Sequence, residues 1–192
     1  MVTILKRCAM IQNNRPTISV FIATSIDGYI AKKDGNIDWL VKFSPPTDDN
    51  EEKDCGFSKF FSTVDVLVMG KNSYEAVSHF DPWPYKGKRV IVLSSTLQSV
   101  CNEAELCKDD IETLIKTLHA DGIKHIYVDG GATISRFLNM NLIDRLIISI
   151  IPVVLGSGIP LFSNMTNDKL CQLISSRAFS NGLVQLQYEP IR

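Results

Sequence analysis

The order of apolar segments along the chain restricts its fold more than any other feature of the sequence. Up to about residue 150, short apolar runs rich in β-branched residues alternate with segments whose pattern predicts helices. After that point, strand-like runs follow one another directly. Strands that alternate with helices build a parallel sheet with helices on its faces, whereas consecutive strands add antiparallel neighbours. The sequence therefore predicts an α/β fold whose mostly parallel, mixed sheet ends in an antiparallel hairpin.

Signals at the ends of the segments place the individual elements. Asp109 or Asp110 can cap a helix, and Gly122 lies where a left-handed residue would end it. The dipeptide Asn181-Gly182 between two alternating runs is a strong hairpin signal. Helices are predicted over residues 51–64, 71–80, 109–122 and 132–141, and strands over residues 17–25, 65–70, 88–95, 123–129, 143–154, 170–179 and 183–191.

Length and composition exclude several classes of protein. The 192 residues suit one domain over residues 17–192, preceded by an N-terminal extension over residues 1–16 or by an arm that packs on a partner subunit. A net charge of −1 gives no basic excess for nucleic acid or an anionic membrane. The five cysteines lack metal-binding spacing, so we expect no metal and a reducing, cytoplasmic location. No apolar run is long enough to span a bilayer, and the start lacks the apolar core of a signal peptide.

A pair of glycines stands where a predicted strand becomes a helix, in the stretch YVDGGATI. Glycine lets backbone N–H groups approach an anion closely, and a helix N-terminus adds positive potential. This pattern favours a phosphate-binding turn that is formed by Gly130, Gly131, Ala132 and Thr133. The alternative is a tight turn that needs positive φ and binds nothing.

Two other strand ends carry groups that could meet an anion. Gly70, Lys71, Asn72 and Ser73 follow one strand, and Ser94 with Ser95 follows the next. Taken alone, these residues could be a solvated lysine beside a capping residue and a plain turn. In open α/β sheets, however, ligands bind beyond the carboxyl ends of the strands. Three such ends on one edge together favour a dinucleotide that carries several phosphates.

Five segments follow one another in a fixed order and spacing along the chain: ISVFIATSIDGYIA, VDVLVMGKNSYEAV, VIVLSS, IYVDGGATI and LIDRLIISIIPVVLGSGIPLF. Together they resemble the dihydrofolate reductase-like fold, and most closely the reductase domain of bacterial riboflavin biosynthesis. The stretch IPVVLGSGIPLF is the most specific of them, and the resemblance covers about residues 17 to 189. It implies a three-layer fold around an eight-stranded sheet, with NADPH as hydride donor.

The resemblance also assigns the cofactor-binding residues. Ala23 and Ile30 resemble residues that line the nicotinamide pocket. The family more often has arginine where Lys71 stands, and a lysine loses the bidentate geometry that would favour NADPH over NADH. The remaining positions resemble the segments for the adenosine-side phosphates, for adenine with its 2′-phosphate, and for the pyrophosphate: Gly70, Lys71, Asn72 and Ser73; Leu93, Ser94 and Ser95; Gly130, Gly131, Ala132 and Thr133.

On the substrate side, the resemblance gives Asp54 the place of a buried catalytic carboxylate, which would favour protonation of the reduced C=N group. The alternative is that Asp54 is one more solvated acid in NEEKDCGF. Ser149 matches a hydroxyl residue beside that carboxylate, or is a plain strand serine. Trp39 lies in the loop that would cover the nicotinamide, or anchors that loop. Asp27 helps to place substrate or, as we favour, caps a turn.

The leading hypothesis is an NADPH-dependent reductase that transfers a hydride to a C=N or C=O carbon of a small heterocycle. It would be most like the 5-amino-6-(5-phosphoribosylamino)uracil reductase of riboflavin biosynthesis, although the chain lacks the HxE and PCxxC motifs of a deaminase. One alternative is dihydrofolate reductase, from which LGSGIPLF departs. Another is a non-catalytic dinucleotide-binding protein that retains the fold. Because domains of this kind often pair through their C-terminal strands, the resemblance also implies a homodimer.

Overall fold

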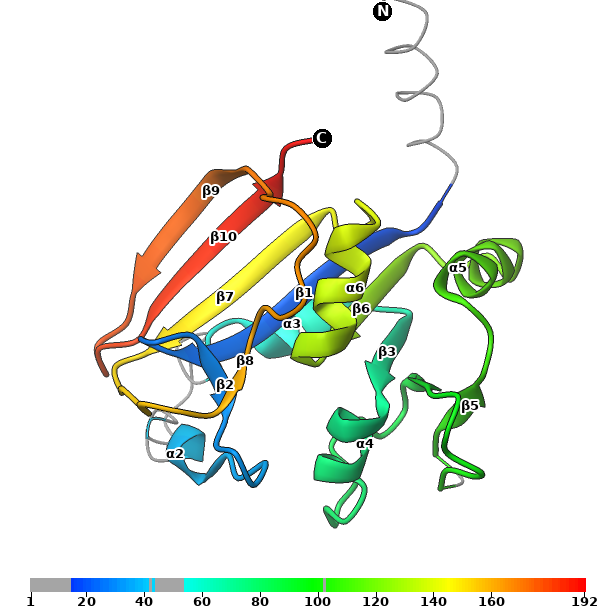
Figure 1. The fold of residues 1–192 in the computed structure, drawn as a ribbon, viewed down its shortest axis with the longest axis horizontal. Coiled ribbons are helices and arrows are strands. Elements are labelled where there is room, and N and C mark those ends of the chain that lie inside the picture. The colour runs from blue at the N-terminus through cyan, green and yellow to red at the C-terminus, as the bar shows by residue number, and fades with distance from the viewer. Residues whose placement is uncertain (1–14, 42, 44–53, 102) are drawn as a thin grey trace, which may run out of the picture.

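A computed structural model describes residues 15–41, 43, 54–101 and 103–192. Within this described part, the main sheet has eight strands in the order β5-β4-β3-β6-β1-β7-β10-β9 (Figure 1). The first six of these strands are parallel to one another, and β10 and β9 add an antiparallel edge beside β7. The main-sheet strands are β1 (Thr17–Ser25), β3 (Val66–Gly70), β4 (Arg89–Leu93), β5 (Glu105–Cys107), β6 (His125–Asp129), β7 (Arg145–Ile151), β9 (Cys171–Ala178) and β10 (Val184–Pro190). The predicted parallel sheet with a C-terminal hairpin is confirmed.

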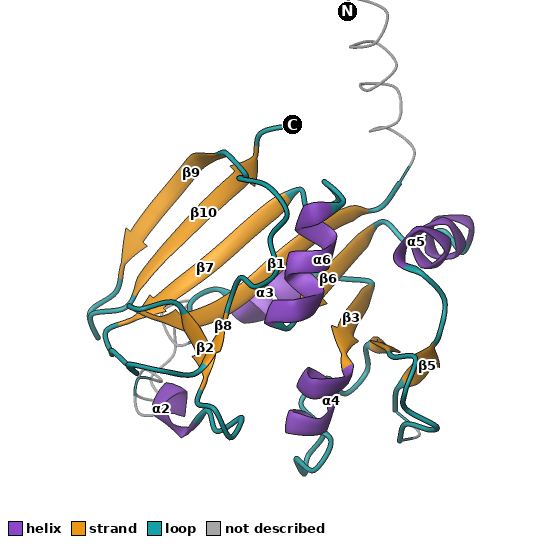
Figure 2. Cartoon of the chain, in the orientation of Figure 1, coloured by secondary structure: helices purple, strands orange, loops and turns teal. Residues whose placement is uncertain are grey.

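Helices cover both faces of the sheet, as predicted (Figure 2). Helices α5 (Ile111–Ala120) and α6 (Gly131–Asn139) share one apolar cluster with strand residues such as Val20 and Val68. Helices α3 (Phe57–Ser62) and α4 (Lys71–Val77) pack on the other face, in a cluster around Leu67 and Tyr127. The central strand β3 is therefore buried on both sides, which explains its continuous apolar run.

The signals at the ends of helix α5 act as the sequence predicts. The Asp110 carboxylate accepts a hydrogen bond from the Thr113 N–H at 2.9 Å and so caps the start of the helix. Gly122 follows its end with φ of 82°. The apolar stripe of the helix is buried against the sheet: Ile111, Leu114, Ile115 and Leu118.

Short elements are the ones that the sequence pattern misses. Strand β5 has three residues, and β2 (Tyr29–Ala31) pairs with β8 (Ile159–Pro160) in a separate two-stranded sheet within the described residues. Runs this short carry too few alternating residues to be recognised. The predicted helix over 51–64 is a helix from Phe57 to Ser62, and residues 51–53 lie outside the described part. A four-residue helix, α2 (Asp38–Val41), was also not predicted.

The two ends of the described chain meet at one carboxylate. Asp144 accepts hydrogen bonds from both terminal nitrogens of Arg15 at 2.9 and 2.8 Å and from Arg192 at 2.6 Å. It also accepts the Ile18 N–H at 2.7 Å, at the start of β1. Both ends therefore lie at the edge opposite to the carboxyl ends of the parallel strands (Figure 1). Residues 1–14 of the predicted extension are outside the described part, and none of the described helices is long and apolar enough to cross a membrane.

Candidate functional site

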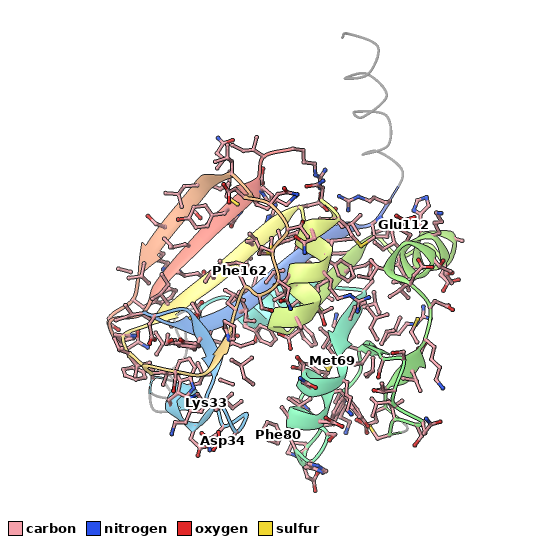
Figure 3. The ribbon with its side chains drawn as sticks, viewed as in Figure 1. Lys33, Asp34, Met69, Phe80, Glu112 and Phe162 are labelled. Atoms are coloured by element: carbon pink, nitrogen blue, oxygen red, sulfur yellow. The ribbon has the colours of Figure 1, made fainter. Side chains whose placement is uncertain are left out.

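The carboxyl ends of β4, β3 and β6 lie next to one another. Strand β3 pairs with β4 on one side and with β6 on the other, and all three are parallel. The registers place Gly70 opposite Leu93 and Met69 opposite Asp129. The structure therefore brings together the three segments predicted to bind a dinucleotide, at one edge of the sheet. Figure 3 labels Met69 near this edge, with Lys33, Asp34 and Phe80 on the loops beyond it.

The glycines at these ends let helices α4 and α6 start against each other. Gly130 has φ of 89°, and a Cβ atom there would lie 2.1 Å from the Ser73 Oγ. A Cβ atom on Gly70 would lie 2.6 Å from the Thr133 Oγ1. A side chain at either position would therefore force the Ser73 or Thr133 hydroxyl to move, and at Gly130 the positive φ adds backbone strain. The positive φ that a tight turn needs is present at Gly130, and the approach of a diphosphate to it stays a prediction.

Gly131 is required for a different contact. A Cβ atom there would lie 2.6 Å from the Pro160 carbonyl oxygen and 2.9 Å from that of Leu161. It would also lie 3.3 Å from the Ile30 Cδ1. The segment IPLF and strand β2 therefore cross the start of α6, which places the predicted nicotinamide residue Ile30 against the glycine turn.

Helix α6 begins without a side-chain cap. Asp110 caps α5, but in the described part of the chain no side chain bonds the N–H groups at the start of α6, which follows Gly130. Ala132 in its first turn is exposed. An uncapped helix start leaves N–H groups that need partners from solvent or a ligand. Such a start suits an anion.

Two predicted anion contacts are engaged by the chain itself. The Ser94 Oγ accepts hydrogen bonds from the N–H groups of Thr96 at 3.2 Å and Leu97 at 3.1 Å, so the turn interpretation applies to it. Lys71 is 41 % exposed, with its Nζ 3.7 Å from Glu75 one helical turn away. A surface pair of this kind contributes little and leaves the ammonium free to reorient. Among the other predicted contacts, Leu93 is buried, whereas Asn72 and Ser95 are exposed.

Asp27 has a structural role larger than a local turn. Its carboxylate accepts hydrogen bonds from the Ser25 hydroxyl at 2.6 Å and from the N–H groups of Leu155 at 3.1 Å and Gly156 at 2.7 Å. The Ser25 hydroxyl and these amides lower the pKa of Asp27. The residue ties the loop after β1 to the LGSG segment, which favours the turn interpretation over a contact with substrate.

Asp54 caps its own helix. Its carboxylate accepts hydrogen bonds from the N–H groups of Gly56 at 3.0 Å and Ser58 at 2.7 Å. Burial alone would raise the pKa of Asp54, but the hydrogen bonds from Ser58 and Gly56 outweigh burial and lower it. A proton donor needs a raised pKa. The geometry therefore supports capping and gives no support to the predicted catalytic role.

Ser149 belongs to a row of three residues, Ala23, Ser149 and Gln185, that runs across three strands. The registers place Ala23 of β1 beside Ser149 of β7, and Ser149 beside Gln185 of β10. The Gln185 Nε2 donates to the Ser149 Oγ at 3.1 Å and to the Cys55 carbonyl at 2.9 Å. Sequence reasoning missed Gln185, because a glutamine in the alternating strand VQLQYEP gives no signal of function.

Trp39 anchors its loop, as one of its two interpretations predicted. It is 5 % exposed and packs in one cluster with Ile151, Phe179 and Leu183, against Ala23 and Cys55 among others. Its indole Nε1 is buried and has no hydrogen-bond partner in the described structure. Buried donors are almost always paired in native proteins, so this N–H is a candidate contact for a ligand or water.

Asp129 is the functional candidate that sequence reasoning overlooked. It ends strand β6, directly before the glycine pair, and is only partly exposed. Burial raises its pKa to about 6, although the Gly130 N–H and the Tyr127 hydroxyl both favour the charged form. Burial and the charge of Asp129 in turn raise the pKa of Tyr85. An acid at the end of a buried strand, in YVDGG, was the available signal.

A pocket lies between the loop after β2 and the segment after β7. It has a volume of about 300 Å³ and is lined by Lys32, Lys33, Asp34, Leu155 and Ser157. No group of three or more His, Cys, Asp or Glu side chains that could hold a metal ion occurs among the described residues.

Comparison with known proteins agrees with this architecture. The sequence model of the RibD C-terminal domain matches residues 16–185. The chain belongs to the RibD C-terminal domain family. Two uncharacterized proteins of Bacillus subtilis (strain 168) are similar over most of their length. YwjB is 37 % identical, covering 88 % of this chain and 95 % of its own, and YyaP is 30 % identical, covering 87 % and 91 %.

Two solved structures are similar to this chain. A Shewanella sp. PV-4 protein named for riboflavin biosynthesis is 39 % identical with a TM-score of 0.83, covering 92 % of this chain and 99 % of its own. The deaminase/reductase of Thermotoga maritima is 15 % identical with a TM-score of 0.71, covering 94 % and 58 %. At that identity, the second similarity shows the fold alone.

Replacing Gly130 by alanine should destabilise the protein by about 2–4 kcal/mol, because the new Cβ meets Ser73 in a backbone conformation reserved for glycine. Urea unfolding measures this change. The control is Gly122→Ala, where φ is 82° but no atom lies within 4 Å of the new Cβ, so about 1 kcal/mol is expected. Adding Ser73→Ala to Gly130→Ala should recover part of the loss. Equal losses of stability in Gly130→Ala and Gly122→Ala would contradict the contact between Gly130 and Ser73.

Asp129→Asn should stabilise the protein above pH 6. The folded pKa of about 6 exceeds the ordinary value of 3.8, so the folded chain holds the proton more tightly. The stability from this group is complete below pH 3.8 and is lost as the pH rises through about 6. Asparagine imitates the protonated form, so at pH 8 the free energy of unfolding should rise by up to about 3 kcal/mol. Urea unfolding at pH 4 and pH 8 measures the difference.

Asp54→Asn is a control for which the free energy of unfolding should change in the opposite direction. Its folded pKa is lowered, so its carboxylate stabilises the fold above the ordinary pKa of 3.8. The substitution should therefore destabilise the protein at pH 8. A destabilising Asp129→Asn at the same pH would contradict the raised pKa of Asp129.

Proposed function

We propose that the protein is an NADPH-dependent reductase that transfers a hydride to a C=N or C=O carbon of a small heterocycle. It would be most like the 5-amino-6-(5-phosphoribosylamino)uracil reductase of riboflavin biosynthesis. One observation carries this proposal: the uncapped start of α6 lies at a carboxyl edge of parallel strands, directly beside an acid whose pKa is near 6. Membership of a family of reductase domains supports it.

The residues present fit a dinucleotide phosphate. The first turn of α6 offers N–H groups without a side-chain cap in the described structure, and Ala132 exposes that turn. Lys71 of the neighbouring helix α4 can reorient toward a phosphate, because its pairing with Glu75 is loose at 3.7 Å. When bound, NADPH would supply the hydride, and Ala23 and Ile30 would border its nicotinamide.

Asp129 is the residue that we propose as the proton donor. A carboxyl group with a pKa of about 6 is partly protonated near neutral pH, so it can supply a proton to nitrogen or oxygen as a carbon accepts hydride. Asp54 is engaged by its own helix, as described above. A buried acid on that helix is what the alternative of dihydrofolate reductase requires, and for this reason we do not favour it.

A cofactor titration tests the proposal. Purified protein is titrated with NADPH and NADH while nicotinamide fluorescence is followed, and NADPH should bind more tightly. Ala132→Asp places a negative charge in the first turn of α6 and should weaken NADPH binding at least tenfold by repulsion of the phosphates. The control is Ala120→Asp, an exposed alanine at the end of α5.

The outcomes separate the hypotheses. Binding that Ala132→Asp abolishes, followed by NADPH oxidation with pyrimidine, pterin or carbonyl compounds, supports the reductase. Binding without turnover of any compound supports the non-catalytic dinucleotide-binding alternative. No binding of either cofactor would refute both, and equal losses in the two alanine variants would remove α6 as the phosphate site.

We further propose that two copies pair through the C-terminal edge of the sheet. All eight residues of strand β9 are exposed, and Leu173 and Ile174, which point to opposite faces, are 51 % and 43 % exposed. An edge strand with unpaired backbone groups and apolar side chains is a template for another strand. A second copy offers the same edge by two-fold symmetry.

Leu173→Lys and Ile174→Lys should each shift the protein from dimer to monomer, because a charge on the shared edge must be desolvated or repelled. Sedimentation equilibrium measures the mass. Phe80→Lys is the control, since Phe80 is 49 % exposed but lies after α4. A wild-type monomer mass would contradict the pairing.

A further inference from the structure

The side-chain amide of Gln185 is held in one orientation. Its nitrogen donates to the Cys55 carbonyl at 2.9 Å, and a carbonyl oxygen can only accept. The amide nitrogen must therefore face Cys55, and the same nitrogen donates to the Ser149 Oγ at 3.1 Å. Among the hydrogen bonds of the described residues, none reaches the amide oxygen of Gln185. Among the described residues, the buried side-chain atoms that lack a hydrogen-bond partner do not include this oxygen.

The same bonds fix what Ser149 can do. Its oxygen already accepts from Gln185, so its own proton is left to donate. Ser149 is 4 % exposed. The Ser149 hydroxyl, as donor, and the Gln185 amide oxygen, as acceptor, therefore lie on neighbouring strands. A planar ring that presents a carbonyl next to an N–H matches this pair. The unpartnered Trp39 N–H, in a cluster that includes Ala23 and Cys55, is a third polar group in the same region.

The row also has the right position for a substrate. Ala23, Ser149 and Gln185 occupy one line across β1, β7 and β10. Neighbouring strands are about 4.8 Å apart, so Ser149 and Gln185 lie about 5 and 10 Å from Ala23. A ring that accepts hydride at the nicotinamide beside Ala23 would extend over this pair. The backbone around it is specialised, because Cys55 has φ of 54°, which is unusual outside glycine.

We propose that Gln185 is a specificity-determining residue, whose amide oxygen and the Ser149 hydroxyl together read the lactam edge of a planar nitrogen heterocycle. The inference rests on the proposed function, because it places the ring at the hydride-accepting position. Cys55 serves as the positioning group, since its carbonyl holds the amide of Gln185 in the required orientation.

Binding of two small probes tests this assignment. NADP⁺-loaded protein, which cannot reduce a probe, is titrated calorimetrically with 5,6-diaminouracil, which has lactam edges, and with 4,5-diaminopyrimidine, which has none. The wild-type protein should bind the uracil at least tenfold more tightly. Gln185→Leu and Ser149→Ala should each reduce that preference at least fivefold, because each removes one polar partner of the lactam.

A matched control lies two residues along the same strand. Gln187 points to the same face and pairs in register with Ile147, so Gln187→Leu makes the same chemical change away from the row. It should leave the preference unchanged. Gln185→Leu also leaves the Cys55 carbonyl without its donor, whereas Ser149→Ala keeps that bond, so the second variant answers the question even if the first is unstable.

Each outcome decides the matter. An unchanged preference in both Gln185→Leu and Ser149→Ala, or no binding of 5,6-diaminouracil to the wild-type protein, would overturn the assignment. Failure to bind NADP⁺ would instead count against the proposed function. In that case, the same titration on cofactor-free protein still measures whether Gln185 reads the lactam.

Discussion

The contact between the starts of α4 and α6 is the constraint on which the candidate site depends. Gly130 and Gly70 have no room for a side chain, because Ser73 and Thr133 occupy the space that a Cβ would need. A side chain at either glycine would therefore displace one of these hydroxyls where the two helices begin. Gly130 also has no side chain that could cap the start of α6. The geometry that permits anion binding thus follows from a packing requirement.

Patterns of repeating residues account for what the sequence predicted well. Long alternating or helical runs gave the parallel strands, the helices on both faces and the C-terminal hairpin, because burial acts on many residues at once. Elements of two to four residues, such as β2 and β8, lack that repetition. The convergence of the three strand ends was also predictable, since the carboxyl ends of neighbouring parallel strands must share an edge.

Individual side chains in the site were harder to predict, because their roles depend on burial and on particular hydrogen-bond partners, which no repeating pattern reveals. Asp54 was assigned from its place in the helix, yet the neighbouring amides of Gly56 and Ser58 set its pKa. Asp129 stood in the motif that was quoted, but only its burial beside Tyr127 reveals its raised pKa. Gln185 becomes visible only once β10 lies beside β7 and faces Cys55.

The joining of Arg15 and Arg192 at Asp144 has a consequence for how the protein can be handled. Arg15 and Arg192 are held at the edge where β1 begins, and the candidate site lies where the parallel strands end. A strand of nine residues spans about 30 Å. An affinity tag or a fluorophore at the C-terminus would therefore stand at the opposite end of the parallel strands from the candidate site. It would leave the candidate site unobstructed, while a dye there could report energy transfer from the reduced nicotinamide of the proposed cofactor.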